Sequence, residues 1–352
     1  KTLFGDSILN LANNILEFFN IENCNLVIMD RGALDFIIAA RIEVAIKKIV
    51  ETEKEYLLPK LLNNTLKTTK DRFRLSRLYL PGNSPKLMIN AGVHNPEGII
   101  LDLEDSVAEP KKFEARFLVR NALRNVDFYG AERMVRINQL PLGFDDLEIV
   151  IPQNPNLILL PKCESAQQVL DVVQKIKQIK NNEDNSIWIM PIIESALGVE
   201  KSFEIATASE KVVALAIGLE DFTADLGVPR TQDANESLYA RTRIVNACKA
   251  AKIQPIDSVF SDVSDMEGLY QNVLKSRSLG FEGMGCIHPR QIAVIQKAFI
   301  PSDAEIEKAK KIVEAFKIAE EKGLGVVSLG SKMIDPPVVK RALQILKLIE
   351  NQ

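Results

Sequence analysis

Eight short apolar runs, most of them followed by a segment of helical period, fill the chain between residues 76 and 289. We expect strands over 78–81, 98–105, 133–138, 157–162, 187–195, 212–221, 255–260 and 282–289. The runs are almost continuously apolar, as parallel strands covered on both faces must be. Eight such units over about 220 residues predict an α/β protein built on a (β/α)8 TIM barrel.

The alternative is an open, doubly wound sheet. Such a sheet usually carries a glycine-rich dinucleotide-binding turn after its first strand. Here that turn reads Pro81-Gly82-Asn83-Ser84, with no G-x-G-x-x-G pattern. The sequence therefore favours the barrel.

The chain has 352 residues, more than one barrel needs. Residues 7–19 and 33–51 have the period of amphipathic helices and flank a strand-like run at 24–30, which predicts a small N-terminal α/β unit over 1–66. After a barrel domain over 74–300, Ser302 and Glu305 form a capping box and Gly323 suits a helix end. These signals predict a C-terminal helical extension over 301–352.

Composition limits the function. The chain is 46% hydrophobic and 26% charged, which excludes disordered, collagen-like and coiled-coil proteins. A net charge of −3 gives no reason to expect nucleic acid or an anionic membrane as partner. No apolar run approaches the ~20 residues that span a bilayer. Four widely spaced cysteines without a C-x-x-C pair indicate a reducing, cytoplasmic location.

Catalytic groups of a barrel lie at the carboxyl ends of its strands, and here these ends are mostly acidic. The chain contains only two histidines, which argues against a multi-histidine zinc site. No Ser/His/Asp or Cys/His arrangement is visible. The candidate groups at the predicted strand ends are Glu104, Asp105, Arg136, Lys162, Glu194, Glu220, Asp221, Asp257 and His288.

Glu194 and Asp221 end neighbouring predicted strands, so their carboxylates could reach one hard cation such as Mg²⁺. Arg136 could hold a substrate carboxylate in two-pronged fashion. This combination suits a 2-oxo acid, whose keto oxygen and carboxylate chelate the cation. Lys162 leaves a Schiff-base aldolase open as an alternative.

These residues also have structural interpretations. Glu104 and Asp105 could cap the next helix, and Arg136 could pair with either of them. Asp335, which precedes two prolines, has the pattern of a helix N-cap with proline at the first helical position. His288 is interpreted as a residue that packs in a loop.

Eight motifs together resemble the citrate lyase beta subunit of the HpcH/HpaI aldolase/citrate lyase family, which also holds malyl-CoA and citramalyl-CoA lyases. The resemblance runs from about Arg74 to the end of the chain. Residues 4–19 and 30–46 resemble the C-terminal part of the citrate lyase gamma subunit, an acyl carrier. The eight motifs are RLYLPG (77–82), LDLEDSVAEP (101–110), VRIN (135–138), LPKCESAQQV (160–169), PIIESALG (191–198), AIGLEDFTADLG (216–227), IHPRQI (287–292) and GLGVVSLGSKMIDPP (323–337).

The resemblance implies roles for particular residues. Arg136 would bind the substrate carboxylate, with Arg77 and Glu194 also in the substrate site. Glu194 and Asp221 would hold Mg²⁺, supported by Glu104 and Asp105.

At the C-terminus, Asp335 would enter the site of a neighbouring subunit as the acid/base. Pro336 stands where the family usually has glycine, which would stiffen this segment.

The implied reaction is the retro-Claisen cleavage of citryl-acyl-carrier to oxaloacetate and acetyl-acyl-carrier. The alternative is a free CoA thioester such as citramalyl-CoA or malyl-CoA, and a non-enzymatic alternative is an inactive scaffold subunit. A homotrimer or homohexamer and a citrate lyase alpha-like transferase are the implied partners. Ser7 does not match the motif that carries the phosphoribosyl-dephospho-CoA arm, so we expect no residue of this chain to carry it.

Overall fold

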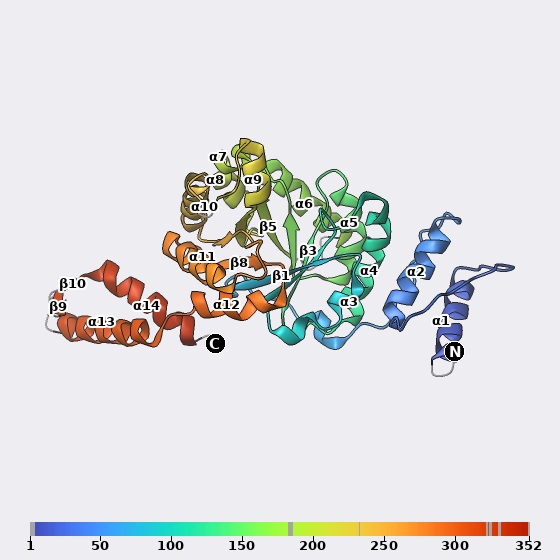
Figure 1. Ribbon diagram of the computed structural model, residues 1–352, viewed down its shortest axis with the longest axis horizontal. Helices are drawn as coiled ribbons and strands as arrows, with labels where there is room; N and C mark the ends of the chain where they lie inside the picture. The colour runs from blue at the N-terminus through green and yellow to red at the C-terminus, as the bar shows by residue number, and fades with distance from the viewer. Residues whose placement is uncertain are drawn as a thin grey trace. The chain divides into compact units, whose positions relative to one another are not determined.

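The computed structural model describes residues 4–181, 186–231, 233–321, 323, 326–329 and 332–350. Eight parallel strands close into a barrel in sequence order, with β1 pairing to β8, and helices surround it (Figure 1). The predicted TIM barrel is confirmed. Its strands are β1 (Ser76–Pro81), β2 (Gly98–Asp102), β3 (Glu132–Arg136), β4 (Leu157–Leu160), β5 (Trp188–Ile193), β6 (Ala214–Ile217), β7 (Gln254–Asp257) and β8 (Gly283–Cys286).

The helices that follow the strands vary in length, and short ones supplement the long ones. They are α3 (Pro85–Met88), α4 (Lys112–Asn125), α5 (Gly143–Val150), α6 (Ala166–Ile179), α7 (Ala196–Glu200), α8 (Ser202–Thr207), α9 (Leu219–Leu226), α10 (Leu238–Ala251), α11 (Met266–Leu279) and α12 (Pro289–Phe299). A buried cluster that includes Ile100, Met134, Met190 and Ile256 fills the space between the strands. The barrel is thus a packed core, which leaves chemistry to its ends.

Several strands are shorter than expected. The strand predicted over 212–221 ends at Ile217, and α9 begins at Leu219. Glu220 and Asp221 therefore lie in the first turn of a helix and not at a strand end. Acidic side chains are stabilised there by the helix dipole, which the apolar pattern alone did not reveal.

The N-terminal segment contains two helices, α1 (Gly5–Phe18) and α2 (Asp35–Lys47), that share a buried apolar cluster. The strand predicted over 24–30 is wrong, because the structure assigns no strand among residues 4–66. Met29 in this run is 92% exposed. A lone extended segment has no neighbour to satisfy its backbone groups, so it remains irregular.

Residues 1–292 form one compact unit, in which α2 packs on α4. A fully buried ion pair joins these helices: Nη1 and Nη2 of Arg120 donate to Oε1 and Oε2 of Glu43 at 3.0 and 2.5 Å. The Arg120 guanidinium also lies over the Phe117 ring. This buried ion pair is one of the contacts that join the N-terminal segment to the barrel wall.

Residues 293–352 form a second compact unit. It contains α13 (Asp303–Glu321), β9 (Val327–Leu329), β10 (Lys332–Ile334) and α14 (Pro336–Glu350). The predicted capping box is present, since the Ser302 and Glu305 side chains each accept a hydrogen bond from the other's backbone N–H. Gly323 adopts a left-handed φ of 73° just after the helix, as expected. No helix among the described residues is long and apolar enough to cross a bilayer.

The Glu43–Arg120 pair gives the first prediction. Glu43→Gln removes the buried counter-charge of Arg120 and leaves it only the partly exposed Glu55, 3.4 Å from its Nη1, so we expect the free energy of unfolding to fall by about 3 kcal/mol. The double variant Glu43→Gln/Arg120→Met removes both charges and should recover most of this loss. Urea denaturation measures both effects.

The control is the partly exposed pair between Arg41 of α2 and Glu114 of α4, whose Nε and Oε1 atoms lie 3.4 Å apart. Arg41→Met should cost less than about 1 kcal/mol. Equal losses at Arg41 and Glu43 would contradict the importance of burial.

Candidate active site

A cavity of about 280 Å³ opens at the carboxyl ends of the strands. Among the residues predicted from sequence, those that line it are Arg77, Asp105, Arg136, Glu194, Glu220, Asp221 and Asp257. Tyr79, Asp102, Gly218 and Ser258 also contribute. The barrel therefore brings together side chains that lie 181 positions apart, from Arg77 to Ser258.

Arg136, the last residue of β3, is held from the side by a carboxylate that the sequence reasoning missed. Its Nε and Nη2 donate to Oδ1 and Oδ2 of Asp102 at 2.6 and 2.7 Å. Its Nη1 lies 2.7 Å from Oε2 of Glu104, and the Tyr79 ring lies beneath the guanidinium. Asp102 uses two of the five N–H donors and Glu104 lies against a third, so two donors remain for a further anion.

In the Asp102–Arg136 pair, each partner stabilises the charged form of the other. Burial alone would lower the pKa of Arg136, but hydrogen bonds and charge from Asp102 outweigh it and raise the pKa. Burial likewise opposes ionisation of Asp102, yet Arg136 holds the pKa of that carboxyl below its usual value. Both groups are therefore ionised at neutral pH.

Glu104 and Asp105 do not cap a helix, because α4 begins only at Lys112. Glu104 is buried and accepts a hydrogen bond from Gln139. Burial raises its pKa to about 7, with Arg136 opposing and Asp105 adding to the rise. Arg136 does pair with these two acids, as the structural interpretation expected, and it also lines the cavity.

Glu194 directly follows β5 and is almost completely buried. Burial, followed by the charges of Glu104 and Asp221, raises its pKa to about 9. Its Oε2 has no hydrogen-bond partner. Gly218 allows this placement, since a Cβ there would lie 2.7 Å from Cγ of Glu194.

Asp221 is half-exposed and lies 3.3 Å from Nζ of Lys162. Burial lowers the pKa of Lys162, but Asp221 and Asp105 outweigh this effect and the net shift is upward. A Schiff-base lysine needs a lowered pKa to be a nucleophile at neutral pH. The structure therefore argues against the Schiff-base alternative.

The carboxylates of Glu194 and Asp221 fit a hard cation. All of their donor atoms are oxygens, and Glu194 offers a buried oxygen that nothing else satisfies. Over the described ranges, no three His, Cys, Asp or Glu side chains converge as a complete metal site. Mg²⁺ commonly binds through one or two carboxylates and fills its remaining positions with water and substrate.

Arg77 lies deeper in the barrel. It is 1% exposed, its Nη1 lies 3.0 Å from Sδ of Met190, and burial lowers its pKa to about 10. Its Nε has no hydrogen-bond partner. Arg77 thus supplies positive charge to the floor of the cavity.

Three further predicted groups, Asp257, His288 and Asp335, have hydrogen-bond partners close to them. Asp257 accepts hydrogen bonds from Arg241 and Ser276. His288 accepts through Nδ1 from the backbone N–H of Arg290, in keeping with a loop-packing residue. In the second unit, Asp335 caps α14 by accepting from the backbone N–H of Val338 at 3.1 Å.

Two residues that sequence reasoning passed over shape the site. Asp102 lies opposite Arg136 in the register of β2 and β3. The first acid of the LDLED motif, at the end of β2, was therefore the sequence signal for this partner. Gly218 precedes α9, and nothing in the sequence distinguishes it from the other glycines of the chain, which has 17 in all.

Two family models match parts of the chain. A family model described as HpcH/HpaI aldolase/citrate lyase matches residues 75–289. An acyl-carrier family model, described as malonate decarboxylase delta subunit, matches residues 1–49. The second match falls on the segment that resembles a citrate lyase gamma subunit.

Two curated relatives cover most of the chain. The citrate lyase subunit beta of Leuconostoc mesenteroides subsp. cremoris is 37% identical over 79% of this chain and 94% of its own length. The human mitochondrial citramalyl-CoA lyase is 32% identical over 78% of this chain and 85% of its own length.

A solved structure has the same fold. CitE from Mycobacterium tuberculosis, in complex with magnesium, acetoacetate and coenzyme A, superposes with a TM-score of 0.68 at 29% identity, and the match covers 79% of this chain and 98% of that one.

The raised pKa of Glu194 gives a prediction for the metal-free protein. Between pH 4.5 and about 9 the folded protein keeps a proton on Glu194 that the unfolded chain has lost, so stability falls as pH rises through this window. Glu194→Gln removes this dependence. We expect it to raise the free energy of unfolding by about 3 kcal/mol at pH 7 and to have little effect at pH 4.

Urea denaturation in EDTA at both pH values tests this, with Glu210→Gln, an exposed site, as the control for loss of a carboxylate. Equal stability of Glu194→Gln and the parent protein at pH 7 would contradict the raised pKa.

Proposed function

The chain belongs to the HpcH/HpaI aldolase/citrate lyase family, and from this premise we propose that it is a Mg²⁺-dependent carbon–carbon lyase of acyl thioesters. The observation that carries the proposal is the cavity in which Glu194, Asp221 and Arg136 meet. Glu194 and Asp221 supply carboxyl oxygens for a divalent cation, which would displace the proton that Glu194 keeps in the metal-free protein. A guanidinium beside them supplies the recognition that an oxo acid needs.

Glu194 and Asp221 are the residues that would hold the ion. Bound there, Mg²⁺ supplies Lewis-acid polarisation of a substrate oxygen. The unsatisfied Oε2 of Glu194 supports this assignment, because a buried oxygen without a partner is destabilising unless a ligand satisfies it.

Arg136 orients the carboxylate of the hydroxy-acid half. Asp102 fixes the guanidinium plane from one side, and the Tyr79 ring supports it from below. A substrate carboxylate then meets a pre-oriented pair of donors, which lowers the entropic cost of reaching a reactive geometry. Arg77, at the cavity floor, adds positive charge for the same half of the substrate.

Cleavage converts the substrate hydroxyl to a carbonyl, with its proton passing to water or a carboxylate of the rim. The electrons of the broken C–C bond remain on an acetyl-thioester carbanion that must be protonated. We assign Asp335 as this acid, contributed by the second unit of a neighbouring subunit in a homotrimer or homohexamer. Asp335 is bound to Val338 through Oδ1 as a helix cap, and such a cap fixes where the carboxylate is presented.

The substrate we favour is citryl on an acyl carrier, with oxaloacetate as product. The acyl-carrier match at residues 1–49 supports a thioester on a protein arm, and a phosphoribosyl-dephospho-CoA group on a partner carrier fits this choice. An alpha-like transferase subunit would supply the citryl group. The human relative, named for citramalyl-CoA, supports the alternative of a free CoA thioester.

We also propose a division into an acyl-carrier-like segment over 1–66, a lyase barrel over 74–300 and a subunit-bridging extension over 301–352. A cytoplasmic location fits the four cysteines, all of which are free thiols.

The metal assignment is tested by paired variants. Glu194→Gln and Asp221→Asn should each lower kcat/KM for citryl-thioester cleavage roughly 10²- to 10⁴-fold, since a Lewis acid contributes several kcal/mol to a transition state. Both should also lose Mg²⁺ binding in calorimetry. EDTA should abolish the parent activity.

Asp225→Asn is the matched control, because Asp225 lies on α9 four residues from Asp221 and outside the cavity. Mg²⁺ binding that persists in both ligand variants would overturn the assignment.

The shared site is tested by mixing inactive variants. Arg136→Met and Asp335→Asn should each be nearly inactive alone. When they are unfolded and refolded together in equal amounts, about a quarter of the sites would combine an intact Arg136 with a neighbour's intact Asp335. Recovery of that share of activity supports the assignment of Asp335, and no recovery rejects it.

A further inference from the structure

Four arginines are among the largest fully buried side chains of the protein: Arg74, Arg77, Arg120 and Arg241. Three of them lie against a carboxylate, in the pairs Arg74–Glu132, Arg120–Glu43 and Arg241–Asp257. Arg77 differs, because no carboxylate among the described residues lies within 4 Å of its guanidinium group. A buried charge without a counter-charge is strongly destabilising, which makes a ligand the candidate for the missing partner.

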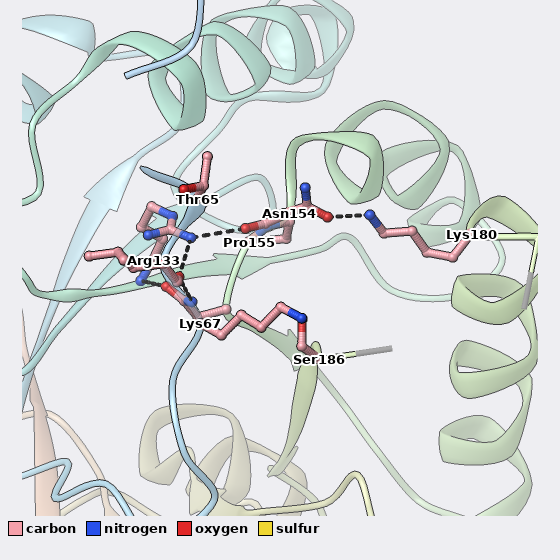
Figure 2. Close-up of a pocket in the computed structure, with 9 residues that line it drawn as sticks. Thr65, Lys67, Arg133, Asn154, Pro155, Lys180 and Ser186 are labelled. Carbon is pink, nitrogen blue, oxygen red and sulfur yellow. Dashed lines mark hydrogen bonds between the residues drawn. The ribbon is translucent and has the colours of Figure 1, made fainter. Parts of the chain in front are cut away.

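The neutral contacts of Arg77 are also few. Its Nη1 lies 3.0 Å from Sδ of Met190, a weak acceptor, and its Nε has no hydrogen-bond partner. Arg133, which lines a separate cavity at the amino ends of β3 and β4 (Figure 2), instead donates from Nη2 to the backbone carbonyls of Leu66 and Asn154 at 3.0 and 3.1 Å. Within the part of the chain that the structure describes, Arg77 has no such carbonyls. Because it lines the floor of the active-site cavity, a bound molecule can supply the missing acceptors.

The barrel leaves space for Arg77 by means of small neighbours. On β1 its side chain and that of Tyr79 lie on the same face, since side chains alternate along a strand. The register partners of Arg77 on both neighbouring strands are glycines, Gly98 on β2 and Gly285 on β8. A Cβ at Gly98 would lie 3.3 Å from Cγ of Arg77, and a Cβ at Gly285 would lie 3.0 Å from the Tyr79 ring. Larger residues at these two positions would therefore crowd both side chains.

Tyr79 adds a hydroxyl group near both arginines of the cavity. The centre of its ring lies 5.4 Å from Cζ of Arg136. Burial, the largest effect, raises the pKa of Tyr79, and the charges of Arg136 and Arg77 oppose this rise. All three residues line the cavity. A phenol O–H donates one hydrogen bond and a guanidinium group up to five, so Arg77 and Tyr79 together can bind an anion.

We propose that Arg77 and Tyr79 form a subsite for a second carboxylate of the substrate, and that the protein thereby selects a dicarboxylic oxo acid as its product. This inference rests on the proposed lyase function. Arg136 binds the carboxylate next to the hydroxyl-bearing carbon, and the new subsite binds the carboxylate at the far end of the acid half. Citryl thioesters carry that second carboxylate in a carboxymethyl group, whereas citramalyl thioesters have a methyl group in its place.

The size of the cavity supports this placement. At about 280 Å³ it is below the ~300–1,000 Å³ of pockets that enclose drug-sized ligands. A small acid fits inside, so the thioester and its carrier extend outward and the acid half faces the floor. A methyl group at the floor would leave the Arg77 guanidinium without an acceptor. A site built to hydrogen-bond one substrate group discriminates strongly against an analogue that lacks it.

The experiment compares the cleavage of citryl-CoA and citramalyl-CoA by the full chain with Mg²⁺. We expect kcat/KM of the parent protein to favour citryl-CoA. Arg77→Met should lower this preference roughly 10- to 100-fold, as expected for loss of a charge-assisted hydrogen bond, and Tyr79→Phe, which removes one oxygen atom, should lower it about fivefold. The control is Arg41→Met, at an exposed arginine of α2, which should keep the parent preference.

Binding of malate and lactate gives a readout that does not depend on turnover. Both are hydroxy acids, and malate has a carboxymethyl group where lactate has a methyl group. In calorimetry with Mg²⁺, malate should bind the parent protein more tightly than lactate. Arg77→Met should remove most of this difference, and Arg41→Met should leave it unchanged.

The outcomes separate this subsite from the lyase proposal. If the parent protein cleaves neither thioester but binds malate through Arg77, the lyase proposal fails and the subsite stands. If the parent protein cleaves both thioesters without preferring citryl-CoA, or if Arg77→Met keeps that preference, the subsite is overturned. Tyr79→Phe decides by the same criteria should Arg77→Met fail to fold.

Discussion

Closure of the barrel, through the pairing of β1 with β8, is the constraint on which the site depends. Parallel strands place all their carboxyl ends on one rim, so loops that are distant in sequence must meet there. Arg77 on β1, Arg136 on β3 and Glu194 after β5 share one cavity for this reason. No single loop contains enough of these groups to bind or cleave anything by itself.

Within that rim, ionisation is set by which groups have a partner. Asp102 and Arg136 satisfy each other, so both stay charged despite burial. Glu194 lacks such a partner, so burial makes it a weak acid that keeps its proton. The metal-free cavity therefore presents a fixed positive charge at Arg136, whereas a cation bound beside Glu194 would displace the proton of that carboxyl group.

The sequence predicted the barrel and most of its rim because the signals are local. Continuous apolar runs predict buried parallel strands, and the acids and Arg136 follow them directly. The strand predicted at 24–30 failed because strand formation depends on a neighbour, which local pattern cannot supply. Asp221 was expected at a strand end and lies in a helix, since an acidic first turn looks much like a polar strand end.

What the sequence could not give is pairing between elements. The Asp102–Arg136 register, the Glu43–Arg120 pair and the convergence of Lys60, Arg133 and Lys180 all join residues that are distant in the chain. In the sequence each of these last three residues has the pattern of an ordinary solvated cation, and only the fold brings them near one another.

Gly218 has a consequence for how this protein can change. A single methyl group at that position would collide with the Glu194 side chain, although position 218 itself carries no functional group. The position of the Glu194 carboxyl group therefore depends partly on a residue that has no functional group. Whether alanine is tolerated at position 218 therefore reports whether the Glu194 side chain still occupies its observed position.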